Sequence, residues 1–346
     1  MIGDMVPYVV SLAAHSPMFT YLPYRESDAD VGWNASYTGS SVWPIIGPNR
    51  TDFHKDAAPA GTAYRRTRVA QASVSLTFEG TGAYMCFSNG GGDYTITLDG
   101  LLLNASAASP AIGSPCEKLN ANTTFATDDL TYGNHTTVLT VTSAPPKDSD
   151  FRFLGGGVTL GLATNGFAVD DTTVIDDQDV GWHFVPPRTP GVRWDTHVVP
   201  GLFNTTVTFN CIYDHQYTAT YTFNESLGVI LTGEKRGPEE HTFSIAFDDE
   251  VHNLDSTSHW GDGDTIYFAK GNLDPTISHV LTIVNWNADK PDCTSIDEFG
   301  HNVDRFCCVS FDSLTLLKAS PRGDTELHIA DFNGHSQRPG QYGFRD

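Results

Sequence analysis

Charged side chains are scarce in this sequence, and basic side chains are the scarcest. Asp, Glu, Lys and Arg make up only 18% of the 346 residues, against about 25% in ordinary soluble proteins. The 42 acidic residues outnumber the 20 basic ones and give a net charge of −22. Such a field repels a phosphate backbone, so nucleic acid is excluded as the expected partner.

Long apolar runs and helical patterns are also missing. No run approaches the roughly 18 apolar residues of a membrane span, so no membrane span is predicted. No window carries an amphipathic helical stripe with caps. Instead, Ala72, Val74, Leu76 and Phe78 alternate with Ser and Thr, as in a strand with one buried face. Such short strands, separated by Gly-rich turns, predict an all-β fold made of jelly-roll β-sandwiches.

An internal repeat predicts two tandem domains. DADVGW at 28–33 recurs as DQDVGW at 177–182, and three further segments align in the same order. These pairs are 73–82 with 218–228, 94–100 with 242–249, and 135–141 with 278–284. We therefore predict an N-terminal extension at 1–16, domains at 17–163 and 170–318, a linker at 164–169 and a polar tail at 319–346. Residues 6–14 look like a short signal-peptide core, but MIGDM before them has no basic residue, which favours a mature strand or extension.

The order of these motifs carries a resemblance. Each half has an Asp-rich opening with a Trp, a strand ending in Thr-Phe, a hairpin Asp and a strand that begins at a His. The residues that carry this pattern in the first half are Asp28, Trp33, Phe78, Asp99, Gly133 and His135. Those in the second half are Asp177, Trp182, Phe223, Asp248, His279 and 311–314. This order resembles tandem galactose-binding-like domain proteins, secreted or surface-anchored, of basidiomycete fungi. The resemblance implies the jelly-roll fold and glycan binding, and it supplies no catalytic residue.

Cysteines and glycosylation sequons indicate an oxidising compartment. The six cysteines form no C-x-x-C pair, which argues against a zinc ribbon, and their even number fits disulfides. Seven N-x-S/T sequons predict N-glycosylation, at Asn34, Asn49, Asn104, Asn122, Asn134, Asn204 and Asn224. We therefore predict a secreted or cell-surface glycoprotein.

The spacing of the cysteines restricts their pairing. The first domain owns only Cys86 and Cys116, which must pair if the domains fold independently. In the second domain, strand alternation would place Cys211 and Cys307 on core faces. The expected bridges there are Cys211–Cys307 and Cys293–Cys308. The alternative, Cys211–Cys308 with Cys293–Cys307, needs only a one-residue bulge.

Aromatic and acidic residues outside the repeat are the candidate sugar-binding groups. Exposed indole rings stack on the C–H face of a pyranose, and nearby polar groups bind its hydroxyls. The predicted carbohydrate site consists of Trp260, Trp286, His259, Asp262 and Asp264, with the polar residues Asn285, Asn287 and Asp289 around Trp286. Trp33 and Trp182 occur in both halves and are interpreted as core packing.

No cofactor or catalytic group is predicted. Asp28, Asp30, Asp177 and Asp179 are of the type that ligates a structural Ca²⁺, but an acidic turn before a strand is the commoner explanation. No pair of carboxylates stands out as the acid and base of a glycosidase, and no G-x-S-x-G elbow is present.

The sequence thus predicts a secreted, N-glycosylated, non-catalytic protein that binds glycans or a cell-wall polysaccharide. Two alternatives stay open at this point. One is a structural surface glycoprotein that self-associates into a homo-oligomer or larger assembly. The other is a carbohydrate-active enzyme with a site between the domains.

Overall fold

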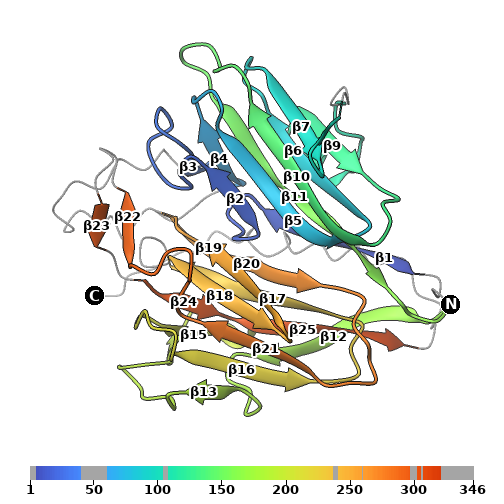
Figure 1. Cartoon of the computed structure of the whole chain (residues 1–346), viewed down its shortest axis with the longest axis vertical. Helices are drawn as coiled ribbons and strands as arrows, with labels where there is room; N and C mark the ends of the chain where they lie inside the picture. Colours follow the sequence, from blue (N-terminus) through green and yellow to red (C-terminus); the bar gives the residue numbers. More distant parts are fainter. Residues whose placement is uncertain are drawn as a thin grey trace, which may run out of the picture.

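The computed structural model describes residues 5–39, 61–103, 108–236, 241–258, 260–296, 302–304 and 307–320 (Figure 1). The regular structure of these residues consists almost entirely of antiparallel strands, which confirms the all-β fold class. The α-helix among them, α1 (Pro115–Lys118), is a single turn. No helix in the described ranges is long and apolar enough to cross a membrane.

The first sandwich packs two sheets, called here sheets A and B. Sheet A has the order β3-β4-β11-β6-β9, with β1 also paired to β11. Its strands are β1 (Val6–Ala13), β3 (Asn34–Tyr37), β4 (Ala63–Thr67), β6 (Gly82–Ser88), β9 (Thr123–Thr127) and β11 (Phe151–Leu162). Sheet B has the order β2-β5-β10-β7-β8. Its strands are β2 (Phe19–Leu22), β5 (Ser73–Gly80), β7 (Tyr94–Leu98), β8 (Leu101–Leu102) and β10 (Gly133–Val141). The chain changes sheet at each step from β5 to β7 and from β9 to β11, as in a jelly roll.

The second sandwich packs sheets C and D. Sheet C has the order β12-β25-β17-β20, from β12 (Ala168–Asp176), β17 (Gly228–Arg236), β20 (Gly261–Lys270) and β25 (Ser313–Ser320). Sheet D has the order β13-β16-β21-β18-β19. Its strands are β13 (His183–Val185), β16 (Thr218–Phe223), β18 (Thr242–Phe247), β19 (Glu250–Asp255) and β21 (His279–Val284). The second half also contains two small sheets. One consists of β14 (Asp195–Val198), β15 (Thr206–Asn210) and β24 (Val309–Phe311), and the turn η1 (Phe203–Thr205) precedes β15. The other consists of β22 (Thr294–Ile296) and β23 (Asn302–Asp304).

Segments that align in the sequence occupy matching places in sheets B and D. The pairs β5 and β16, β10 and β21, and β7 and β18 take the second, third and fourth positions of the two sheets. An aspartate–histidine contact recurs with them. His135 Nδ1 lies 2.8 Å from Asp99 Oδ2, and His279 Nδ1 lies 2.8 Å from Asp248 Oδ2. Each pair ties the end of a hairpin to the neighbouring strand.

The cores follow the alternation that the sequence predicts. In β5, Val74, Leu76 and Phe78 are buried, whereas Thr77 is exposed. Each such large side chain removed from water contributes about 1.5–3 kcal/mol. Trp33 and Trp182 are both buried in the cores, as predicted, and their indole N–H groups donate to backbone carbonyls.

The two sandwiches share a buried seam. Leu160 and Leu162 of the first sandwich belong to the same apolar cluster as Leu227, Ile230 and Leu317 of the second. Hydrogen bonds cross this seam as well, from the side chains of Tyr8, Ser16 and Tyr132 to Asp171, Ile266 and Gly271. In Figure 1 the first sandwich stands over β17 and β20 of the second. The halves are therefore held to one another by packing and by hydrogen bonds.

Candidate functional site

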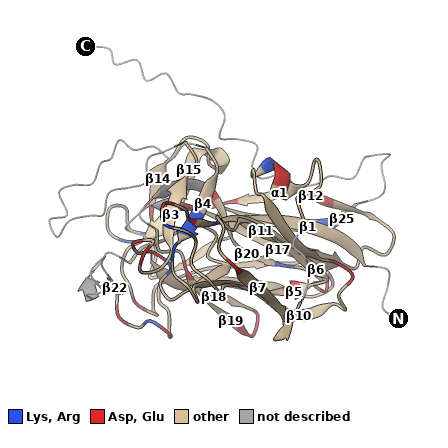
Figure 2. Cartoon of the chain, turned by 90° about the horizontal axis from the view of Figure 1, so that it is seen from above, with Lys and Arg blue, Asp and Glu red and all other residues tan. Residues whose placement is uncertain are grey.

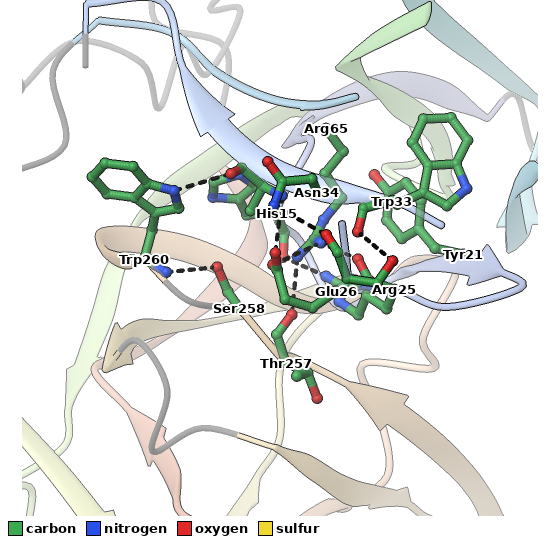
Figure 3. A network of polar contacts seen from close by, with 12 residues as sticks. His15, Tyr21, Arg25, Glu26, Trp33, Asn34, Arg65, Thr257, Ser258 and Trp260 are labelled. Atoms are coloured by element: carbon green, nitrogen blue, oxygen red, sulfur yellow. Dashed lines mark hydrogen bonds and ion pairs between the residues drawn. The ribbon is translucent and has the colours of Figure 1, made fainter. Parts of the chain in front are cut away.

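Trp260 lies in the seam and not at the surface. Its side chain is 2% exposed, its ring centroid is 5.4 Å from that of Tyr37, and its indole N–H donates to Ala35 O at 3.0 Å (Figure 3). The expectation that Trp260 offers a sugar-stacking face is therefore wrong. The reason is tertiary: the start of β20 faces β3 of the other sandwich, and the ring fills the space between them.

A buried network of polar groups lies beside Trp260 (Figure 3). Arg65 forms an ion pair with Glu26 at 3.1 Å and donates across the seam to Thr257 O at 3.0 Å. Burial, reinforced by the charge of Arg65, lowers the pKa of Arg25 to about 10, and its guanidinium donates to the carbonyls of His15, Ser16 and Phe19. Because the hydrogen bond from Arg65 to Thr257 crosses the seam, we interpret the network as one that holds the two sandwiches together.

The other residues of the predicted carbohydrate site do not lie together. His259 and the side chain of Asp262 lie outside the described part of the structure. Asp264 is exposed on β20, where its neighbour in register is Glu234. Trp286 is partly exposed, and its ring contacts His215, with centroids 5.9 Å apart and planes at 68°. Trp260 and Trp286 thus contact different rings and do not form one platform.

Trp286 and His215 form an aromatic pair at one end of sheet D. His215 precedes β16, Trp286 follows β21, and the two strands are neighbours. The His215 side chain is 67% exposed. Ser244 Oγ lies 2.7 Å from Trp286 O and 2.8 Å from Asn253 Oδ1, and the Asn253 amide donates to Asp289 Oδ2 at 2.9 Å. An exposed Asn–Asp pair therefore lies beside the aromatic pair.

Buried amides hold the loop that carries Trp286. Asn285 donates to the carbonyls of Asn210, Ile212 and Cys307, and Asn287 donates to Leu254 O. Both were expected near the indole as sugar ligands, but they are buried. Their role here is to hold the loop in one conformation.

Two disulfides tie the loops of the aromatic pair to one segment. Cys211 bonds Cys308, and Cys293 bonds Cys307. The loop of His215 begins at Cys211, and the loop of Trp286 ends at Cys293. Both loops are thus joined covalently to the segment before β24, which restricts their motion.

These bridges correct the pairing expected in the second half. Cys86–Cys116 is confirmed. The pairs Cys211–Cys307 and Cys293–Cys308 are wrong, and the alternative left open by the sequence, Cys211–Cys308 with Cys293–Cys307, is the one observed. Asn210 of β15 is opposite Val309 of β24, so the antiparallel register places Cys211 opposite Cys308. Side-chain alternation alone does not reveal that register.

The acids considered as calcium ligands serve local turns. Asp28 accepts the backbone N–H of Asp30 at 2.9 Å, and Asp179 accepts that of Gly181 at 2.7 Å. Asp177 is buried and accepts hydrogen bonds from the hydroxyls of Thr206 and Thr208. Within the described ranges, no group of three or more His, Cys, Asp or Glu is arranged to hold a metal ion.

Carboxylates from both sandwiches meet at Lys270. Its ammonium lies 2.7 Å from Glu79 Oε2 and 2.8 Å from Glu250 Oε2. The hydrogen bond from Lys270 holds the pKa of Glu250 below its usual range. A glycosidase acid needs a raised pKa so that it keeps its proton. Glu79 and Glu250 are therefore suited to holding the two sandwiches together through Lys270 rather than to acid catalysis.

Asp312 is a buried acid that makes the stability of the fold depend on pH. Its side chain is 1% exposed, and burial, with the charges of Asp264 and Asp177, raises its pKa to about 8. The folded protein therefore binds a proton that the unfolded chain releases near pH 4, and stability falls as the pH rises toward 8.

We expect Asp312→Asn to flatten this dependence and to stabilise the protein at pH 8 by several kcal/mol. Urea unfolding of both forms at pH 5.5, 7 and 8.5 measures the effect. A wild-type stability that rises between pH 5.5 and 8.5, or an Asn variant with the same slope, contradicts the assignment.

Comparison with known proteins finds only distant structural likenesses. No family model matches the chain, and no curated protein matches it. A xanthan lyase of Paenibacillus aligns over 75% of this chain at 11% identity with a TM-score of 0.27, and this chain spans 24% of that enzyme. The ANXUR1 extracellular domain from Arabidopsis thaliana aligns over 75% of this chain and 83% of its own length, at 12% identity and a TM-score of 0.27.

The tandem CBM22 domains of Paenibacillus barcinonensis Xyn10C align over 92% of this chain and 98% of theirs, at 9% identity and a TM-score of 0.23. Likenesses at such scores carry no argument about function, so the site stands on its own geometry.

Sequence reasoning found Trp286 and missed His215. A signal was present, because both residues lie a few positions from a cysteine. Loops fixed by disulfides lose little conformational freedom on binding, and this criterion distinguishes Trp286 from Trp260.

Proposed function

We propose that this protein is a secreted, non-catalytic carbohydrate-binding glycoprotein whose ligand contacts Trp286 and His215. The observation that carries the proposal is an aromatic pair on two loops that disulfides and buried amides hold. The indole face stacks on the C–H face of a pyranose, while Asn253 and Asp289 bind its hydroxyls. Because the loops are already ordered, binding costs little entropy. The resemblance to galactose-binding-like proteins agrees with this proposal.

Removal of Trp286 tests the proposal. We expect Trp286→Ala to weaken glycan binding by about 1–3 kcal/mol, a 5- to 150-fold rise in Kd, the scale of a binding hot spot. The wild-type protein is first screened on a glycan array, and its best ligand is then measured by isothermal titration calorimetry.

The matched control is Phe167→Ala, which removes another aromatic side chain that is 46% exposed and lies in the chain segment between β11 and β12. Its affinity is expected to equal that of the wild type. A Trp286→Ala variant that is folded and binds as tightly as wild type rejects the site.

Secretion and glycosylation form part of the proposal. Three disulfides support an oxidising compartment. Exposed sequons are expected to carry glycan, at Asn122, Asn134, Asn204 and Asn224. Asn34, expected in solvent from the sequence, is 8% exposed, and its amide donates to Ser27 O. Asn49 and Asn104 lie outside the described residues.

Peptide mapping after deglycosylation checks this expectation on protein from a eukaryotic secretory host. Asn122, Asn134, Asn204 and Asn224 should be converted to Asp, whereas Asn34 should stay Asn. Glycan at Asn34 in the folded protein, or none at the four exposed sites, contradicts it.

A further inference from the structure

The outer face of sheet D carries no charge in its two full cross-strand rows. One row reads His183, Thr220, Thr282, Ala246 and Val251. The next reads Val185, Thr218, Val284, Ser244 and Asn253. None of these is Asp, Glu, Lys or Arg, although the chain has a net charge of −22. In Figure 2 much of the red of the acidic residues lies in loops and at strand ends.

This uncharged face carries exposed methyl groups beside its hydroxyl groups. Val251 is 67% exposed and Val185 is 42% exposed. Thr220 and Thr282 lie with their hydroxyls 3.0 Å apart. The core side of the same strands is filled by residues such as Phe184 and Ile283, so nothing in the sandwich requires valines on the outside. The two valines lie on the two edge strands, β13 and β19, and threonine side chains of β16 and β21 lie between them.

The face is continuous with the aromatic pair. Ser244 belongs to the second row, and its hydroxyl contacts Trp286 O and Asn253 Oδ1. Trp286 therefore stands at the border of the face. A ligand stacked on the indole and longer than a few sugars has this uncharged sheet beside it.

We propose that Trp286 and the outer face of sheet D together bind the flat surface of a neutral polysaccharide. The proposal rests on the carbohydrate-binding function above and names its ligand class. Sheet strands lie about 4.8 Å apart, so the two rows form a broad surface of hydroxyl and methyl groups rather than a groove. Acidic polymers and a second copy of this chain are disfavoured, since both are negatively charged.

The first sandwich supplies a matched control. On sheet B, Ser75 is opposite Val138 as Thr220 is opposite Thr282 on sheet D. By the alignment of His135 with His279, Thr142 stands where the second half has Trp286. Sheet B thus has an equivalent strand pair without the aromatic residue at its border.

The test compares Thr220→Glu with Ser75→Glu, which change the net charge equally. Depletion from solution by microcrystalline cellulose, chitin and insoluble β-1,3-glucan measures the bound fraction, with polygalacturonate as the acidic polymer. We expect wild type to bind at least one neutral solid, unchanged by salt, and not polygalacturonate. Thr220→Glu should reduce that binding about tenfold because a carboxylate must be desolvated, and Ser75→Glu should not.

Soluble hexasaccharides of the same polymers separate this proposal from the function on which it rests. Thr220→Glu should retain hexasaccharide binding measured by calorimetry, whereas Trp286→Ala should lose both kinds of binding. If Trp286→Ala loses binding but Thr220→Glu binds the solid like wild type, the extended face is rejected and the carbohydrate function stands. If Trp286→Ala changes neither, both are rejected. Equal losses in Thr220→Glu and Ser75→Glu also reject sheet D as the binding face.

Discussion

Trp260→Ala is expected to lower the free energy of unfolding by about 3–5 kcal/mol, the cost of removing a large buried aromatic side chain. The ring lies in the seam against Tyr37, and its N–H satisfies Ala35 O. Alanine there leaves a cavity between the sandwiches and an unpaired buried carbonyl. Denaturant unfolding followed by far-UV circular dichroism measures the loss.

Trp286→Ala is the comparison, because it changes the same residue type at a partly exposed position. It should cost less than about 1 kcal/mol of stability, as surface substitutions usually do, while weakening glycan binding. Trp260→Ala should show the reverse: low stability and, in the folded fraction, an unchanged Kd. A Trp260→Ala protein of wild-type stability that no longer binds glycan would return Trp260 to the binding site.

Removal of the Cys211–Cys308 bridge should have an effect of similar size. This disulfide closes a segment of 97 residues, for which the loss of chain entropy predicts about 4–5 kcal/mol of stabilisation. The variant Cys211→Ser/Cys308→Ser is therefore expected to unfold at much lower urea concentration. Because Cys211 begins the loop of His215, we also expect weaker glycan binding.

Cys86→Ser/Cys116→Ser is the matched control in the first sandwich. Its bridge spans 30 residues, which predicts about 3–4 kcal/mol, and it lies away from the aromatic pair. That variant should lose stability and keep its affinity at temperatures where it is folded. If both double variants bind glycan equally well, the disulfides do not order the site.

Local features of this protein were predictable because they depend on neighbours along the chain. Side chains alternate across any strand, so the pattern at Val74, Leu76 and Phe78 identifies a half-buried strand without knowledge of its partners. The matching segments of β5 and β16 could be aligned for the same reason. The Cys86–Cys116 pair followed from simple counting.

Register and packing were not predictable, because they join residues far apart in the chain. Whether Cys211 meets Cys307 or Cys308 depends on a one-residue difference in how β15 pairs with β24, and a single sequence carries no such information. Asn285 and Asn287 looked like sugar ligands, yet they bond to carbonyls from β15, β19 and the segment before β24.

Trp260 and Trp286 show the difference between what the sequence predicts and what tertiary packing decides. The sequence by itself determined an all-β chain of alternating strands and placed an indole near polar residues at both Trp260 and Trp286. Only the tertiary structure decided that Trp260 faces β3 of the other sandwich while Trp286 remains partly exposed beside His215. The physical reason is that burial belongs to the packing of one sheet on another. That packing depends on all the strands together, whereas alternation depends on each strand alone.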